Sequence, residues 1–208
     1  LADDMGMGDT SAYQDFTGNS DSDQIQTPNM ERLARRGVRF TDAHTPSSRC
    51  SPTRYALLTG RYPWRNRLKH WVLFGAQGDP MIEADRPTLA TMLRDFGYRT
   101  AMVGKWHLGT EPEFLPRTQG FDSYYGMPCN FNHSPKFFDG DKEVFARTPL
   151  DRLTQLYTER VTKIIHDQAT RSEPFFLYYA HNYPHTPYQA GKDFKGSSKD
   201  GVRGDVMQ

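Results

Sequence analysis

An uninterrupted apolar run, Phe175-Phe176-Leu177-Tyr178-Tyr179-Ala180, constrains the fold of this chain more than any other stretch. Such a run, bounded by Pro174 on one side and a polar loop on the other, is typical of a central strand that is covered on both faces. A second stretch, Tyr98 to Val103, has the same buried character. Strands of this kind occur in sheets flanked by helices, so the pattern predicts an α/β fold with a mostly parallel sheet.

Helices are expected before and between these strands. A proline just inside the start and a glycine after the end predict one helix at about 28–36, with an apolar stripe of Met30, Leu33 and Ala34. The segment 87–96 carries apolar residues at i, i+3, i+4 and i+7, and the segment 150–166 is also amphipathic. We further expect a short strand at 38–40, and a long functional connection at 110–147 that is rich in aromatic residues, proline and glycine.

Composition excludes some classes of function. The 208 residues include 26 basic and 25 acidic ones, for a net charge of +1, without a polybasic run of the kind that binds nucleic acid. No apolar run approaches the roughly 20 residues of a membrane span. We therefore expect no nucleic-acid partner and no membrane span. The first and last residues form no complete element, so we interpret the chain as part of a longer one, incomplete at both ends.

Cys50 opens a segment with the character of a helix N-terminus. Pro52 suits a first helical turn, and Gly60 can end the helix. A helix N-terminus favours an anion, and Arg54 adds a positive charge one turn on. The alternative is a small buried cysteine beside a surface arginine. A disulfide between Cys50 and Cys129, the two cysteines of the chain, also stays open.

Polar loops follow three predicted strands, the first of which is a strand end at Leu1-Ala2. Adjacent carboxylates at Asp3 and Asp4 repel each other, which a hard divalent cation would relieve; an Asx-turn or N-cap pair is the alternative. Lys105 and His107 lie two residues apart, so in an extended segment they would face the same side. The alternative is a solvated lysine and an ordinary hydrogen-bonded histidine. Loops at the carboxyl ends of parallel strands meet at one edge of the sheet, where ligands bind in α/β proteins.

The third loop holds two histidines, His181 and His185. Either could donate a proton near neutral pH, or one could cap the loop. Together with the carboxylates, the cations and the Cys50 segment, this combination suits the cleavage of a sulfate or phosphate ester.

Four segments resemble one family in the right order. Cys50-Ser51-Pro52-Thr53-Arg54, with Leu58-Thr59-Gly60-Arg61 behind it, resembles the signature of the type I, formylglycine-dependent sulfatases of the alkaline phosphatase-like superfamily. The other three matches are Leu1-Ala2-Asp3-Asp4-Met5-Gly6, Gly104-Lys105-Trp106-His107-Leu108-Gly109, and Phe175–Ala180 leading into Pro184-His185-Thr186-Pro187. The resemblance implies a three-layer α/β/α sandwich, with 1–208 as the N-terminal portion of the catalytic domain. The rest of that domain and a small C-terminal domain would lie outside this chain.

The resemblance also implies a mechanism for hydrolysing an aryl or carbohydrate sulfate monoester. Cys50 would be converted by a maturation enzyme to formylglycine, whose hydrate attacks sulfur and forms a covalent sulfo-enzyme. Arg54 and His107 would hold this hydrate. The metal would be Ca²⁺ rather than Mg²⁺, bound by Asp3, Asp4 and an oxygen of the modified Cys50.

The remaining implied roles concern the substrate. Lys105 and His185 would contact the sulfate, and one of them would protonate the leaving oxygen. His181 would face the substrate or support the site. From their residues alone, we expect the aromatic segments 62–74 and 124–133 to line the mouth of the pocket, where their rings could stack on a sugar or aryl ring or pack against each other. The resemblance further implies export to the periplasm, the cell exterior or the lysosome. Asn132-His133-Ser134 fits a glycosylation sequon.

Departures from the family leave alternatives. The family's other metal ligands and one sulfate-binding lysine lie beyond residue 208. Thr53 stands where serine is commoner, and Arg49 is a less usual neighbour of Cys50. The alternatives are a phosphonate monoester or phosphodiester hydrolase, and a non-catalytic member with an unmodified Cys50.

Overall fold

The computed structural model describes residues 1–17, 25–69, 71–74, 81–131 and 133–207. The chain divides into two compact units. The first, the sheet unit, consists of Leu1, Thr45–Thr148 and Gln155–His181, and the second unit consists of Ala2–His44, Pro149–Thr154 and Asn182–Gln208. The sequon residue Asn132, as well as His70 in the segment 62–74, lies outside the described residues.

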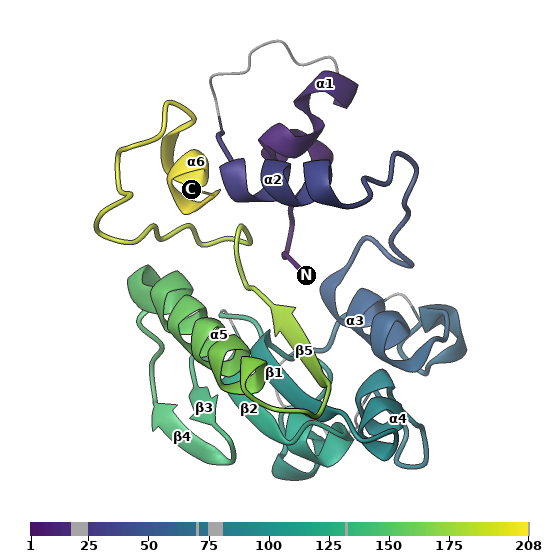
Figure 1. The fold of residues 1–208 in the computed structure, drawn as a ribbon. Coiled ribbons are helices and arrows are strands. Elements are labelled where there is room, and N and C mark those ends of the chain that lie inside the picture. Colours follow the sequence, from purple (N-terminus) through teal and green to yellow (C-terminus); the bar gives the residue numbers. More distant parts are fainter. Residues whose placement is uncertain (18–24, 70, 75–80, 132, 208) are drawn as a thin grey trace. The chain divides into compact units, whose positions relative to one another are not determined.

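A five-stranded sheet forms the centre of the sheet unit (Figure 1). Its order is β4-β3-β2-β1-β5, and the middle strand β1 is parallel to β2 and to β5. The hairpin β3–β4 adds antiparallel to β2. The strands are β1 (Arg99–Lys105), β2 (Ser123–Met127), β3 (Phe137–Asp139), β4 (Lys142–Phe145) and β5 (Phe175–Ala180).

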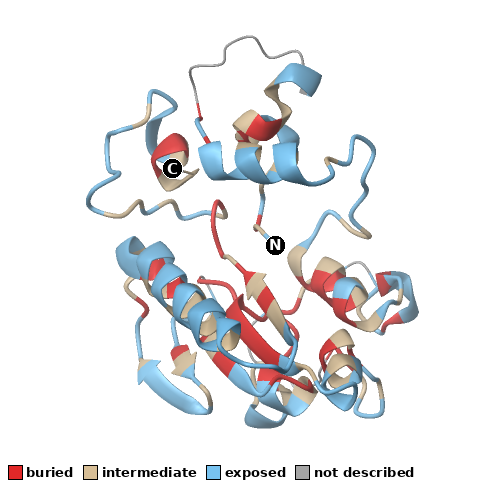
Figure 2. Cartoon of the chain, viewed as in Figure 1, coloured by how far each residue is buried: buried red, intermediate tan, exposed pale blue. Residues whose placement is uncertain are grey.

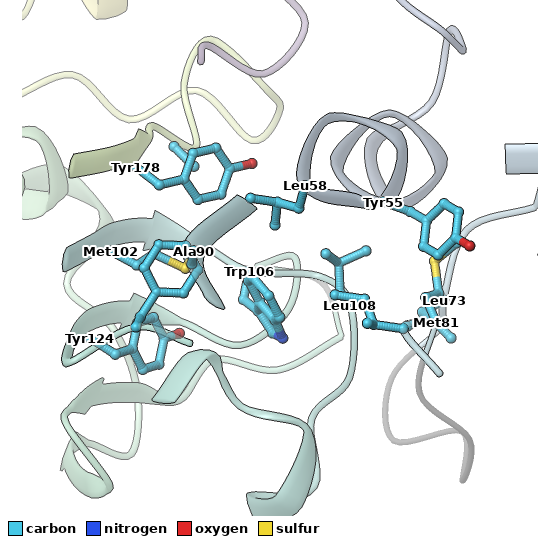
Figure 3. Packing of buried hydrophobic residues seen from close by; sticks show 13 residues of the cluster. Tyr55, Leu58, Leu73, Met81, Ala90, Met102, Trp106, Leu108, Tyr124 and Tyr178 are labelled. Carbon is cyan, nitrogen blue, oxygen red and sulfur yellow. The ribbon is translucent and has the colours of Figure 1, made fainter. Parts of the chain in front are cut away.

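Helices pack on both faces of this sheet. Successive side chains of a strand point to opposite faces, so apolar side chains on each face can contact a helix. Met102, Tyr124 and Tyr178 share one face and pack with residues of α3 (Cys50–Thr59) and α4 (Leu89–Asp95), as Figure 3 shows. On the other face, Tyr157 of α5 (Leu153–Ala169) stacks on Phe137 at 5.8 Å between ring centroids. The expected α/β/α layering is therefore confirmed within the sheet unit.

Local signals explain where α3 begins and ends. It starts at Cys50, carries Pro52 in its first turn, and ends before Gly60, which adopts a left-handed φ of 66°. The face that carries Ser51, Pro52, Arg54, Tyr55 and Leu58 is buried. The next helix, α4, begins with a capping box in which the Thr88 side chain accepts from the Thr91 amide. The apolar stripe expected on α4 is buried only in part, since Met92 is 46% and Phe96 77% exposed.

Three close-packed small residues lie side by side at the carboxyl ends of the parallel strands. Gly104 of β1 pairs with Gly126 of β2 and with Ala180 of β5. A Cβ placed on Gly104 would lie 1.9 Å from the Ala180 carbonyl oxygen, and one on Gly126 would lie 2.0 Å from the Gly104 oxygen. These neighbours therefore leave no space for a side chain at either glycine.

The second unit consists of short helices joined by loops. Figure 2 shows exposed surface over much of α2, and no residue of α2 is buried. The apolar stripe expected on α2 is therefore exposed, with Leu33 at 74%. Arg203 of α6 donates to the Asp9 carboxylate at 3.0 and 2.6 Å and so joins distant parts of the chain. The helices are the 3₁₀ turns η1 (Met7–Asp9), η2 (Ser11–Tyr13) and η6 (Leu150–Arg152), and α1 (Gln14–Thr17), α2 (Pro28–Arg36) and α6 (Gly201–Met207).

Several expectations about strands and loops are wrong. Residues 38–40 form no strand, and Val38 is 78% exposed. The connection at 110–147 contains β2, β3 and β4, as well as the 3₁₀ turns η4 (Pro112–Phe114) and η5 (Pro116–Gln119). These strands have three to five residues each and gain their pairing from β1 and from one another, which no local periodicity reveals. The expected central strand β5 lies at the end of the sheet, with Phe175 exposed.

Leu1 and the segment after α3 also make local contacts within the sheet unit. Leu1 is not part of a strand, but its nitrogen donates to the Tyr179 carbonyl and its carbonyl accepts from the His181 amide, which extends the pairing beside β5. The segment after α3 contains the 3₁₀ turn η3 (Pro63–Arg65), where Tyr62 and Trp64 stack at 4.0 Å. Among the described helices, none is both long enough and apolar enough to cross a bilayer.

Candidate active site

Cys50 is the first residue of α3 and is half-buried. The residue before it, Arg49, has extended backbone and makes no side-chain cap, and its guanidinium lies 5.0 Å from the Trp71 ring centroid. The Thr53 hydroxyl donates to the Ser47 carbonyl at 2.7 Å and ties the turn before the helix to its first turn. As the sequence predicted, Cys50 therefore lies where the helix dipole favours negative charge.

The side chain of Arg54 connects α3 to the end of β1. It is 1% exposed, and its Nη1 donates to the Lys105 carbonyl at 2.5 Å. A guanidinium is planar and carries five donors in a fixed arrangement, so one firm bond restricts the orientation of the others. This contact fixes a permanent cation one turn after Cys50, at the carboxyl end of the sheet.

Lys105 and His107 lie at the carboxyl end of β1, with Trp106 between them. Lys105 is the last residue of β1 and is fully buried, whereas the sequence placed it in a loop. His107 has a left-handed φ of 62° and is 2% exposed. The segment is therefore not extended through His107, so the spacing of two residues does not place both side chains on one side. Parallel pairing continues past the strand, since the His107 amide donates to the Pro128 carbonyl at 3.0 Å.

A short chain of hydrogen bonds links His107 back to α3. Its Nε2 lies 2.8 Å from the Leu73 carbonyl oxygen, and the Leu73 amide donates to the Ser51 hydroxyl at 3.3 Å. Because a carbonyl oxygen can only accept, the proton is on Nε2 and the lone pair of the neutral ring is on Nδ1. Sequence reasoning missed both Ser51 and Leu73 as positioning residues. No local signal in the sequence around Leu73 could have identified it.

His181 lies in an aromatic setting at the end of β5. Its ring meets Tyr157 and Tyr179 edge to face, with centroid separations of 5.4 and 5.7 Å. Burial raises the pKa of the Tyr179 phenol to about 12, so that phenol is neutral at physiological pH. His181 is therefore held by packing between aromatic rings, which suits a supporting role.

The second unit brings together the other predicted residues. Asp3 is 6% exposed, and its amide donates to the Tyr183 carbonyl at 3.4 Å. Asp4 adopts a left-handed φ of 67°, and one of its carboxylate oxygens lies 3.8 Å from Nε2 of His185. The Asp3 carboxylate and a ring nitrogen of His185 lie within 4.8 Å of each other. Two carboxylates of adjacent residues, one of them buried, are an oxygen donor set that fits a hard cation such as Ca²⁺.

Further contacts position this carboxylate pair. Nδ1 of His185 lies 2.5 Å from the Thr186 carbonyl, so that nitrogen carries the proton and Nε2 faces Asp4. Nη2 of Arg203 donates to the Asp4 carbonyl at 3.0 Å. Arg203 is another residue that sequence reasoning missed, and its distance of 199 positions from Asp4 explains why no local pattern revealed it.

The structure thus groups the predicted residues by unit. Cys50, Arg54, Lys105 and His107 belong to the sheet unit, as does His181. Asp3, Asp4 and His185 belong to the second unit. Neither cysteine takes part in a disulfide, which answers the question left open for Cys129.

Comparisons with known proteins agree with these motifs. The family model described as Sulfatase matches residues 3–205. The chain is 35% identical to N-acetylgalactosamine-6-sulfatase of Mus musculus and 37% identical to arylsulfatase A of Bos taurus, over its whole length in both cases. It covers 43% and 44% of these two relatives, so it spans less than half of their length. A solved 6S-sulf structure from glycosaminoglycan metabolism in Bacteroides thetaiotaomicron matches with a TM-score of 0.87 and 26% identity, over all of this chain and 55% of the other.

Proposed function

This chain belongs to the sulfatase family, and we propose that the complete protein is a sulfuric ester hydrolase that cleaves sulfate monoesters of carbohydrates or aryl alcohols. The match of residues 3–205 to the family model carries this proposal. Curated relatives that align over the whole chain and are named as sulfatases support it. The local structure of α3 supports it too, because a helix N-terminus and a buried arginine favour the binding of an oxyanion.

We assign the nucleophile to Cys50 after its oxidation to formylglycine. As a hydrated aldehyde, this group supplies one hydroxyl for attack on sulfur and a second hydroxyl whose deprotonation releases sulfate. The position of Cys50 fits the group, because the residue is half-buried at the start of α3 and its neighbour Ser51 is held by the Leu73 amide.

Arg54 and His107 hold and orient the residue at position 50 in this proposal. The bond from Arg54 to the Lys105 carbonyl and the bond from His107 to the Leu73 carbonyl restrict both side chains before substrate binds. Preorganised cations and donors stabilise charge that develops in a transition state without first having to reorient. The buried Lys105 adds a second cationic group, besides Arg54, for the sulfate oxygens.

His185 contacts the sulfate and donates the proton that the leaving oxygen takes up. Its ring is oriented by the Thr186 carbonyl, which leaves Nε2 as the atom that exchanges a proton. Lys105 is the other proton donor that the proposal allows. His181 supports the site or contacts the substrate beyond the ester.

Asp3 and Asp4 would hold Ca²⁺, with an oxygen of the modified residue 50 as a further ligand. The ion would supply charge for a sulfate oxygen, as a Lewis acid. Ca²⁺ suits the oxygen donors of this loop better than Mg²⁺, because it accepts irregular geometry and several carboxylates.

The partners follow from the same proposal. They are a sulfated small molecule or glycan as substrate, and an enzyme that converts Cys50 to formylglycine. The relative named N-acetylgalactosamine-6-sulfatase makes a 6-sulfated amino sugar the first glycan to test. We also propose an exported protein, since family members act mostly outside the cytoplasm.

The proposal is tested on the full-length protein, produced together with a formylglycine-generating enzyme. Sulfate release is measured from an aryl sulfate and from 6-sulfated N-acetylgalactosamine, with the matching phosphate esters in parallel. We expect turnover of at least one sulfate ester and its loss in Cys50→Ala. Ser48→Ala is the matched control, because Ser48 is exposed and lies two residues from Cys50.

Three results would contradict the proposal. Undiminished turnover in a folded Cys50→Ala protein would exclude formylglycine as nucleophile. Faster cleavage of the phosphate esters or phosphonates would indicate a phosphonate monoester or phosphodiester hydrolase. A mass spectrum of the Cys50 peptide from the native host with only the thiol would indicate a non-catalytic member of the family.

A further inference from the structure

A second group of metal-ligating side chains lies within the sheet unit. One ligand atom each of His107, Cys129 and His133 lies within 4.8 Å of the other two. All three residues belong to the stretch Thr45–Thr148 of that unit. Two imidazoles and one thiol differ in chemistry from the carboxylates of Asp3 and Asp4. Nitrogen and sulfur ligands select zinc and related ions over Ca²⁺.

Backbone pairing holds two of these residues together. Beyond the ends of β1 and β2, the Trp106 amide donates to the Met127 carbonyl at 2.9 Å and the His107 amide donates to the Pro128 carbonyl at 3.0 Å. This places Cys129 one residue beyond the last bond. Because the parallel pairing sets the register, the proximity of His107 and Cys129 is a property of the sheet and not of a loose loop.

The tautomer of His107 suits a ligand. Its Nε2 proton is directed to the Leu73 carbonyl oxygen at 2.8 Å, which leaves the lone pair on Nδ1. Metal-ligating histidines commonly donate their other N–H to a backbone carbonyl or carboxylate, which fixes the ring and makes the ligand nitrogen more basic. The outer contact that such a site needs is therefore already present.

The burial of the three residues allows both a dry centre and access for an ion. His107 is 2% exposed and Cys129 is fully buried, whereas His133 is exposed. His133 also lines a cavity of about 850 Å³ together with Pro128. Its backbone is held in a turn by the bond from its amide to the Asn130 carbonyl at 3.0 Å, so its side chain stays beside the pair while remaining accessible.

We propose that His107, Cys129 and His133 bind a borderline divalent ion such as Zn²⁺, with a fourth position left for water. Tetrahedral zinc with bonds of about 2.0–2.3 Å places its ligand atoms about 3.3–3.6 Å apart. The exposed His133 side chain can rotate to bring its ring nitrogen within that range. The thiol proton of Cys129 is released to solvent when the thiolate binds.

Occupation of this site has a consequence that rests on the proposed function. His107 would hold the residue at position 50, and a metal bound to Nδ1 would withdraw it from that role. Zn²⁺ is therefore expected to inhibit the enzyme in the presence of excess Ca²⁺. Inhibition would arise at a site that Ca²⁺ does not occupy, so Ca²⁺ would not relieve it.

Binding is tested on the full-length protein with Co²⁺ as a spectroscopic probe for Zn²⁺. A bound thiolate gives cobalt an intense charge-transfer absorption, which we expect in the wild type and expect to disappear in Cys129→Ser. In His133→Ala the affinity for Co²⁺ should fall at least about tenfold, since even partners of a ligand are worth about 10–100-fold. His166→Ala is the matched control, because His166 is an exposed histidine of the same unit. Cys50→Ser should keep the absorption.

Inhibition is the second readout. Measured against its own activity without added zinc, His133→Ala should require at least about tenfold more Zn²⁺ than the wild type for half-inhibition. A cobalt absorption that persists in Cys129→Ser, or unchanged metal affinity in His133→Ala, would overturn the proposal. If Cys129→Ser does not fold, the His133→Ala titration decides. A thiolate–cobalt absorption in a protein without sulfatase activity would support the metal site while the proposed function fails.

Discussion

Replacing Gly104 with alanine should destabilise the sheet unit severely. A Cβ at this position would lie 1.9 Å from the carbonyl oxygen of Ala180 and 2.5 Å from its carbonyl carbon. Both atoms belong to the backbone of β5, so no side-chain rotation can relieve the overlap. The φ of Gly104 is 119°, a value that residues with a Cβ rarely adopt.

The cost has two parts. Holding alanine at such a φ costs about 1–3 kcal/mol. Forcing extra volume into close-packed surroundings typically costs about 1–3 kcal/mol more, through displacement of β5 from β1. The total of about 2–6 kcal/mol is a large share of the 5–15 kcal/mol by which a domain is typically stable. For a domain of this size it corresponds to a fall in Tm of about 10 °C.

Urea unfolding of the full-length protein, followed by circular dichroism and by tryptophan fluorescence, measures this loss. Gly60→Ala is the matched control, because Gly60 also has a left-handed φ, 66°, but has no atom within 4 Å of the added Cβ. The control should lose only about 1–2 kcal/mol from backbone strain. If Gly104→Ala lowers the free energy of unfolding no more than Gly60→Ala does, the close approach of β1 and β5 does not exclude a side chain at position 104.

Three other changes test separate contacts. Burial acts to raise the pKa of the Asp9 carboxyl, but the hydrogen bonds from Arg203 and the Gly6 amide, together with the charge of Arg203, outweigh it and hold the pKa below its usual value of 3.8; this stabilisation is present above the usual pKa and is lost as pH falls through the lowered folded pKa. Arg203→Gln should therefore reduce the free energy of unfolding by about 1–2 kcal/mol at pH 7 and by less at pH 3. Scanning calorimetry would show this as a larger fall in Tm at pH 7 than at pH 3. Thr88→Ala removes the N-cap bond of α4 and should cost about 1 kcal/mol in urea unfolding, whereas Thr88→Ser should cost little. Arg54→Lys keeps the charge but not the planar donors that reach the Lys105 carbonyl, so kcat should fall about 100-fold with an unchanged circular dichroism spectrum; a variant with normal kcat would remove Arg54 from the proposed mechanism.

Local signals carried most of what could be predicted of the fold. The bounds of α3 follow from Pro52 and Gly60, whose effects on the backbone act within a few residues. The strand at 175–180 follows from its apolar run. The strands within 110–147 were missed because β3 has three residues and forms by pairing with β2 and β4. The exposure of Leu33 was missed because helical periodicity indicates a shared face without showing what covers it.

In the candidate site, too, sequence identified the residues of local motifs but not the contacts between residues far apart in the chain. Motif positions such as Cys50 and Lys105 were identified because the family spacing is local in sequence. The contacts that orient them were not, since the bond from His107 to Leu73 joins residues 34 positions apart through the fold. The grouping of His107 with Cys129 depends on the register of β1 and β2, which sequence does not reveal.

The burial of α3 bears on the order in which the proposed oxidation of Cys50 and the packing of this helix would take place. Ser51 and Pro52, which follow Cys50 directly, are buried, and Arg54 is joined to the end of β1. A maturation enzyme needs access to the chain on both sides of the cysteine, so it would have to act before this helix docks. Folding and oxidation then compete in time, and a chain that folds first keeps its thiol. A change that slows folding without slowing the maturation enzyme should therefore raise the fraction of molecules that are converted.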